Sequence, residues 1–184
     1  AEQEASENNV DVSKFDGYFQ GVNTAAASVT SSITNAWTYY LSAAYWEGLG
    51  EYNDALVDYK KAFSLAPDVD FLKQDIERVS RKLDRRWKDQ TGVGVILHGQ
   101  GLVPPKREVM IPIPTIHGYF SVAFPVYTPE DQLPPVPLHA QAETSTVSSE
   151  VLVRVNGAAA RALKDKIPGM LVRQTLRAAS KYQA

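Results

Sequence analysis

The sequence predicts an α+β fold: a helical stack in the first half, followed by a small β-sheet with C-terminal helices. Two changes in the spacing of apolar residues carry this prediction. Up to about residue 90, apolar side chains recur every three or four positions, which is typical of helices that bury one face. From Thr91 onward, short β-branched runs stand between glycines and prolines, as in strands and turns, and helical spacing returns after Asn156.

This change of pattern divides the 184-residue chain into three expected parts. Residues 1–12 are acidic and polar and are expected to be a flexible N-terminus. Residues 13–90 are expected to form the helical domain, and residues 91–184 the strand-rich domain with its C-terminal helices.

Composition narrows the classes of function. The formal net charge is -2, so overall charge gives no support to nucleic-acid or anionic-membrane binding. The chain has no cysteine, which excludes disulfides and disfavours a structural zinc site. No apolar run approaches the roughly 18 residues that a membrane-spanning helix requires. We therefore expect no transmembrane segment, no nucleic-acid partner and no cofactor.

Four helices are expected in the first half. The first, with glycines near its start and many Ser and Thr residues, is the least regular, and the last begins after Asp70, which is a predicted N-cap. Glycines end the second helix and Pro67 ends the third. Their expected spans are Phe15–Asn35, Ala36–Leu49, Tyr52–Leu65 and Phe71–Trp87.

The second half is expected to alternate strands with proline-rich connections. Pro112 and Pro114 favour an edge position for their strand, because proline cannot donate to a sheet ladder. The five prolines of Pro125–Pro137 predict an extended loop, and Pro168 is expected to stop the first C-terminal helix. The expected strands are Val93–Leu97, Glu108–Ile113, Tyr119–Val126 and Ser148–Val155, and the expected helices are Ala158–Ile167 and Met170–Tyr182.

The helix pair over residues 36–65 carries the pattern of one tetratricopeptide repeat (TPR), a helix–turn–helix unit of about 34 residues. Small residues stand where the two axes would cross, aromatic residues surround them, glycine makes the turn and proline ends the pair. The matching residues are Tyr39, Ala43, Trp46, Gly50, Tyr52, Ala55, Tyr59, Ala62 and Pro67. Segment 36–69 therefore resembles a TPR unit, with an ordinary amphipathic hairpin as the alternative. One repeat cannot bury its own faces, so Phe15–Asn35 and Phe71–Trp87 are expected to flank it.

The TPR resemblance implies a binding surface, because the first helix of each TPR pair lines a concave groove. On this helix Trp37, Tyr40, Ala44 and Glu47 share a face, since they are three or four positions apart. Two aromatic residues beside a carboxylate suit peptide recognition. The alternative is that Phe15–Asn35 packs over this face and makes it part of the core.

Longer strings are similar to a family of bacterial cell-envelope proteins, often lipoproteins, that pair a TPR-like half with a strand-rich half. The strings are YWEGLGEYNDALVDYKKAF, VILHGQGLVPPKREVMIPIP, SVAFPVY and IPGMLVRQTLRAASKYQ. The resemblance spans roughly Ala36 to Tyr182. It implies a periplasmic location, with a possible outer-membrane anchor through a lipid on a residue absent from this chain. It also implies a role without catalysis, in which the partner is another envelope protein.

One motif suggests chemistry. The apolar run that leads into His98-Gly99-Gln-Gly101 resembles the oxyanion-hole turn of α/β-hydrolases, which makes a small hydrolase using His98 and Gly99 the alternative function. No G-x-S-x-G nucleophile elbow accompanies it. His98, His117 and His139 lack the close spacing of metal ligands. We therefore expect no catalytic or metal-binding residues, and a scaffold or adaptor that binds another protein.

Overall fold

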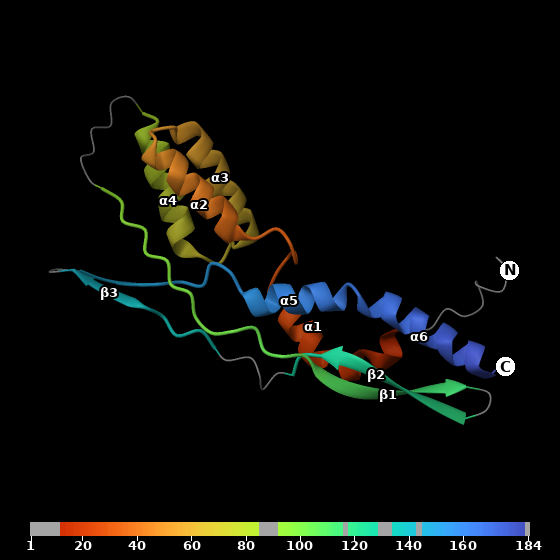
Figure 1. The fold of residues 1–184 in the computed structure, drawn as a ribbon. Coiled ribbons are helices and arrows are strands. Elements are labelled where there is room, and N and C mark those ends of the chain that lie inside the picture. Colours follow the sequence, from red (N-terminus) through yellow and green to blue (C-terminus); the bar gives the residue numbers. More distant parts are fainter. Residues whose placement is uncertain (1–11, 85–91, 116–117, 129–133, 143–144, 183–184) are drawn as a thin grey trace. The chain divides into compact units, whose positions relative to one another are not determined.

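The computed structural model confirms the α+β class and describes residues 12–84, 92–115, 118–128, 134–142 and 145–182 (Figure 1). Internal contacts divide the chain into two compact units. The helical unit comprises Thr30–Leu102 and Leu133–Val155. The hairpin unit comprises Ala1–Val29, Val103–Gln132 and Asn156–Ala184. No helix in the described ranges combines the length and the apolar character needed to cross a membrane.

This division differs from the expected boundary near residue 90. The chain leaves the hairpin unit after Val29, forms the helical unit, and re-enters the hairpin unit at Val103 and again at Asn156. The reason lies near the N-terminus, where Phe15 and Phe19 are buried in the same core as the strands instead of covering the TPR-like pair. Residues 1–11 of the expected flexible N-terminus lie outside the described residues.

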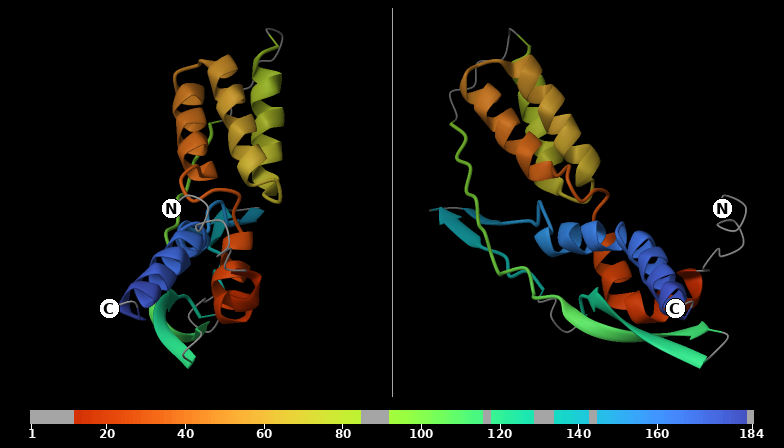
Figure 2. Two further views of the ribbon diagram at one scale, coloured as in Figure 1. Left: turned by 90° about the vertical axis from the view of Figure 1, so that its right-hand side faces the viewer. Right: turned by 45° about the vertical axis from the view of Figure 1, so that its right-hand side comes forward.

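The helical unit is built on the helices α2 (Ala36–Gly48), α3 (Tyr52–Leu65) and α4 (Asp70–Lys82), with α3 packed against both of the others (Figure 2). The Asn35 side chain accepts a hydrogen bond from the Thr38 N–H at 3.1 Å and so caps the start of α2. Gly50, with φ of 82°, makes the turn into α3 in a conformation that favours glycine. The expected bounds of α2 and α3 are therefore confirmed to within one residue.

Small residues let α2 and α3 pack closely. Ala43 of α2 and Ala55 and Ala62 of α3 are fully buried, as the TPR pattern requires. The Tyr59 ring is fully buried among them, and Val69, Leu72 and Val79 add the contribution of α4 to the same core. The remaining matched aromatic residues, Tyr39, Trp46 and Tyr52, pack against this core and are half-buried, whereas Gly50 and Pro67 are exposed.

The start of α4 differs from the prediction. The helix begins at Asp70 itself, and Val69 occupies the N-cap position without a side-chain cap. The Asp70 carboxylate instead accepts from Lys73 Nζ at 2.8 Å, while its N–H donates to the Glu150 carboxylate at 2.7 Å. A carboxylate brought from a distant segment therefore satisfies the first donor of this helix. The helix ends at Lys82, so the expected span to Trp87 was too long; Trp87 itself lies outside the described residues.

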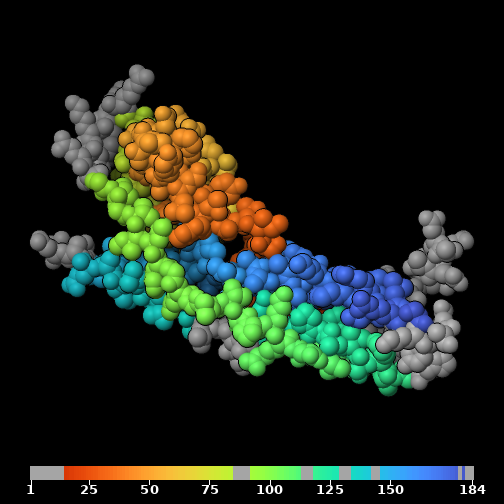
Figure 3. Space-filling model, in the orientation of Figure 1, coloured from red at the N-terminus to blue at the C-terminus, as the bar shows by residue number. Residues whose placement is uncertain are grey.

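Two expected strands, Val93–Leu97 and Ser148–Val155, are largely replaced by extended chain that does not pair regularly with another strand. Residues 92–106 form no strand, so the prediction of Val93–Leu97 was wrong, and segment 92–102 lies on the surface (Figure 3). Residues 149–154 are also irregular, because Leu152 and Val153 pack against the helical core instead of pairing with another strand. The helical unit has one short hairpin among its described residues, made by β3 (His139–Ala142) and β4 (Ser145–Ser148).

The hairpin unit contains the 3₁₀ helix η2 (Val12–Phe19) and helix α1 (Gln20–Ala27) in place of the single helix expected over Phe15–Asn35. Its strands β1 (Arg107–Thr115) and β2 (Gly118–Val126) pair antiparallel over their whole length. Alternate residues of β2, Val122 and Phe124, face the core, where Phe124 meets Phe19 edge-on at 5.9 Å between ring centroids. These contacts make the sheet and the N-terminal helices one packed unit.

Helices α5 (Val155–Lys164) and α6 (Ile167–Tyr182) complete the hairpin unit, each starting three residues earlier than expected. Pro168 does not stop a helix as predicted. It lies in the first turn of α6, where proline is tolerated because the first N–H groups of a helix have no partner within it. Gly157 brings α5 close to the end of α1, since a Cβ there would lie 3.1 Å from the Ala25 carbonyl oxygen.

Candidate functional site

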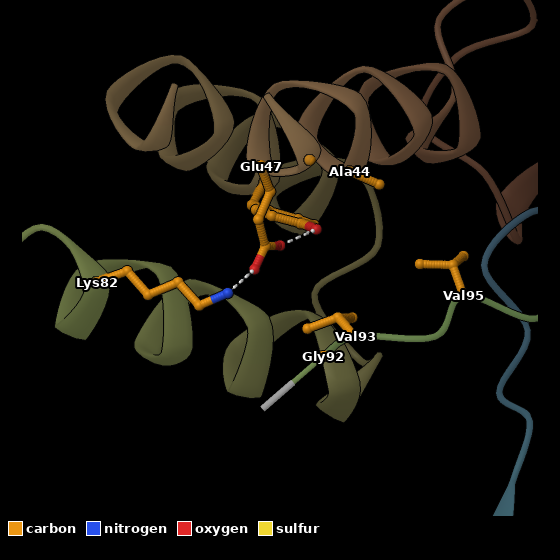
Figure 4. Close-up of a pocket in the computed structure, with 8 residues that line it drawn as sticks. Ala44, Glu47, Lys82, Gly92, Val93 and Val95 are labelled. Atoms are coloured by element: carbon orange, nitrogen blue, oxygen red, sulfur yellow. Dashed lines mark hydrogen bonds and ion pairs between the residues drawn. The ribbon is translucent and has the colours of Figure 1, made fainter. Parts of the chain in front are cut away.

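A buried charge cluster holds α2 against its two neighbours. The Glu47 carboxylate of α2 accepts hydrogen bonds from Arg78 of α4, at 2.8 Å from Nη2 and 3.1 Å from Nε. It also accepts from Lys82 Nζ and from the Tyr59 hydroxyl, both at 2.9 Å (Figure 4). Arg78 pairs in addition with Asp75 on its own helix. One carboxylate thus joins all of the helices α2, α3 and α4.

Burial and neighbouring charges shift the pKa values of Glu47, Tyr59 and Asp75. Burial alone would raise the pKa of Glu47, but the hydrogen bonds from Arg78, Lys82 and Tyr59 lower it to about 2. Burial and the neighbouring carboxylate raise the pKa of Tyr59. For Asp75, burial outweighs the attraction of Arg78 and raises the pKa. Glu47 is therefore a carboxylate at neutral pH and is committed to binding cations of its own chain.

The predicted groove is not an open surface, because α4 covers much of it. Tyr40 is buried, with its ring 5.7 Å from that of Tyr59 and 5.4 Å from that of Phe71. Glu47 belongs to the charge cluster, with only 7% of its side chain exposed. The prediction of an exposed groove was therefore wrong at these positions. The alternative prediction, that Phe15–Asn35 packs over this face, was also wrong, because α4 covers it.

The other two predicted groove residues remain partly accessible. Trp37 is 38% exposed, and Ala44 lines a pocket of about 210 Å³ between the helices and the extended chain after residue 91 (Figure 4). The walls of the pocket are formed by Ala44, Glu47, Gly48, Tyr59, Lys82, Gly92, Val93 and Val95. Its polar groups include the Tyr59 hydroxyl and Lys82 Nζ, which both donate to the Glu47 carboxylate, so these groups are already paired within the chain.

An exposed apolar stripe runs along α2, beginning at Trp37 and turning away from the predicted groove face toward the end of the helix. Trp37, Leu41 and Tyr45 follow one another at four-residue steps, and Leu49 continues the series just beyond the helix end. Their exposures are 38%, 36%, 65% and 57%. We call these four residues the α2 stripe. The sequence analysis did not predict this stripe, because it grouped Trp37 with Tyr40 and Ala44. The apolar residues at four-residue steps after Trp37 are the sequence signal that would have indicated it.

The exposed side of α2 also carries no charge. The charged residue within Ala36–Gly48 is Glu47, and its side chain points into the cluster. An exposed helix face normally carries charged or polar residues. In a stack of repeats, the helix pair of a preceding repeat packs on the first helix of the next one. The α2 stripe is thus an apolar helix face of the kind that another helix normally covers.

The histidine motif does not form the geometry that its resemblance requires. His98 is exposed and lies in the extended segment after residue 91, where no strand forms. His139 Nδ1 lies 2.8 Å from the Ser148 hydroxyl across the β3–β4 hairpin, and His117 is outside the described residues. Within the described ranges, no group of three or more His, Asp or Glu side chains could hold a metal ion.

Comparisons with protein-family models, with curated proteins and with solved structures found no match to this chain.

Proposed function

We propose that this protein is a non-enzymatic scaffold or adaptor of a bacterial cell-envelope assembly, and that it binds another protein through the α2 stripe. The observation that carries the proposal is the uncharged, exposed apolar face of α2. Hydrogen bonds of Glu47 hold this helix against α3 and α4. The envelope location rests on the sequence strings that resemble cell-envelope proteins. Protein binding rests on the surface itself.

The α2 stripe has the composition of an interface centre. Aromatic residues dominate the binding energy of protein interfaces because they bury a large area with few rotatable bonds. Trp37 and Tyr45 supply two such anchors, with Leu41 between them and Leu49 at the end. The four residues extend over about 18 Å of helix length, at 1.5 Å per residue. This length suits an apolar helix of a partner.

The charge cluster holds α2 in one position before a partner binds. Glu47 ties α2 to α3 through Tyr59 and to α4 through Arg78, at distances of 2.8–3.1 Å. A helix fixed in this way loses little conformational freedom when a partner binds. Because the stripe has no charge, attraction to the partner arises from apolar burial, which salt does not screen.

Affinity capture with matched variants tests the proposal. The tagged chain, a Tyr45→Ser/Leu49→Ser variant and a Val57→Ser control are used to capture proteins from envelope extracts, at low and at high salt. Val57 is a fair control because it is 51% exposed on α3. We expect one or more proteins to be captured by the parent and the control at both salt concentrations, and to be lost with the stripe variant. The proposal is wrong if the stripe variant captures the same proteins as the parent while the parent and both variants are equally stable.

A further inference from the structure

The two outer edges of the β1–β2 hairpin differ in their ability to bind another strand. In the observed register, Pro112 lies opposite Ser121 and Pro114 lies opposite Tyr119. Residue pairs in an antiparallel ladder alternate between those that exchange hydrogen bonds and those that do not. Proline has no N–H, so these two pairs belong to the kind without hydrogen bonds. The backbone N–H and C=O groups of Tyr119, Ser121 and, two residues on, Ala123 therefore point away from β1.

The edge of β1 is protected against further pairing. Its outward positions include Pro112 and Pro114, which lack the N–H that an added strand would need, and the charged Glu108. Prolines and charges at these positions are the usual means by which proteins prevent edge-to-edge association.

The edge of β2 lacks such protection from Tyr119 to Ala123. Gly118–Val126 contains no charged residue, and its one proline, Pro125, stands near the end. Among the described residues, no hydrogen bond to the outward groups of Tyr119, Ser121 or Ala123 is seen. The side chains of these three residues are exposed, and that of Tyr119 is 79% exposed.

We propose that β2 binds β2 of a second copy of this chain, antiparallel, and joins the two hairpins into a four-stranded sheet. A register centred on Ser121 places Tyr119 opposite Ala123 of the second copy, so that residues with outward hydrogen-bonding groups face each other. The two strands then exchange about six backbone hydrogen bonds, two for each of the three pairs. The large Tyr119 ring meets a small residue, and no like charges oppose each other.

The prolines of β1 also determine the size of the assembly. Pairing through β2 alone uses the same edge of both copies, which closes a twofold dimer. The sheet that results has a proline-blocked β1 at each end, so a third hairpin cannot be added. On the core face, Phe120, which is half-buried in the single chain, comes to lie beside Val122 of the second copy. The kind of partner that fits this edge is therefore an identical strand.

Proline substitution on either edge tests this proposal by sedimentation equilibrium of the full chain. Ser121→Pro removes an outward N–H from β2, as Pro112 does on β1, whereas Met110→Pro makes the matched change on the β1 edge. We expect a concentration-dependent dimer for the parent and for Met110→Pro, and a monomer for Ser121→Pro. A monomeric parent, or a Ser121→Pro variant that still dimerises, would overturn the proposal. The α2 stripe variant should dimerise like the parent, which separates this test from that of the proposed function.

Disulfide trapping gives a second test that does not depend on the folding of the proline variants. The chain has no cysteine, so Ser121→Cys introduces a single thiol at the proposed symmetry axis. Hydrogen-bonded pairs have Cα atoms about 5.5 Å apart, which suits a disulfide. Under mild oxidation, Ser121→Cys should form a covalent dimer much faster than Met110→Cys, a residue that is 53% exposed. Equal rates for the two variants would overturn the proposal.

Discussion

Replacing Glu47 with glutamine should destabilise the helical unit strongly. The substitution keeps the shape of the side chain but removes the charge that Arg78 and Lys82 share, at 2.8 Å and 2.9 Å. A pKa of about 2, against an ordinary value of 4.5, means that the fold favours the carboxylate at neutral pH by about 3 kcal/mol, since a tenfold change in acidity equals about 1.4 kcal/mol. We therefore expect Glu47→Gln to lower the free energy of unfolding by about 3 kcal/mol.

The same substitution should change the pH dependence of stability. Because folding lowers the pKa of Glu47, its contribution is present above pH 4.5 and is lost as the pH falls toward 2. Urea denaturation followed by far-ultraviolet circular dichroism at pH 7, 5, 4 and 3 measures this directly. The stability difference between the parent and Glu47→Gln should shrink as the pH falls, and the exposed Glu51→Gln serves as the control variant in the same series. A Glu47→Gln variant within about 0.5 kcal/mol of the parent at pH 7, the usual range of surface substitutions, would refute this reasoning.

Three further stability predictions follow from the packing, each measured by thermal or urea denaturation. Ala43→Leu should cost about 1–3 kcal/mol, because the residue is fully buried where α2 meets α3; a variant as stable as the parent would argue against close packing there. Tyr40→Ala should cost about 3–5 kcal/mol, whereas Trp37→Ala should cost clearly less, because Trp37 is 38% exposed; equal losses would show that the α2 stripe belongs to the core. Gly157→Ala should destabilise the contact of α5 with α1, whereas Gly169→Ala, with open space at its Cβ position, should be neutral or stabilising.

Local patterns were sufficient to predict the helix pair α2–α3. Their boundaries follow from glycine and proline, and the burial of Ala43, Ala55 and Ala62 follows from the residue sizes that two closely packed helices require. Strand β2 was predictable for a similar reason, since the alternation around Val122 and Phe124 has the period of a half-buried strand.

The surroundings of these elements depend on contacts between distant parts of the chain. The period of α2 shows which residues share a face, but not that α4 covers Tyr40 and leaves Tyr45 exposed. Likewise, the apolar spacing around Phe19 predicts a buried face, and the β1–β2 hairpin satisfies it as well as a neighbouring helix would. Val93–Leu97 has the composition of a strand, but no strand in the described part of the chain pairs with it. The choice of binding surface therefore required the structure.

Site-specific photocrosslinking in the cell tests the central claim, that the α2 stripe binds another protein. A photoreactive phenylalanine derivative is placed at Tyr45, and at Val57 of α3 as a control of similar exposure, 65% against 51%. If the α2 stripe binds another protein, we expect the residue at position 45 to form a discrete crosslinked adduct with that protein, and the residue at position 57 to form none. That adduct should disappear when Leu41→Ser and Leu49→Ser are added. No adduct at position 45, or the same adducts at both positions, would contradict the claim.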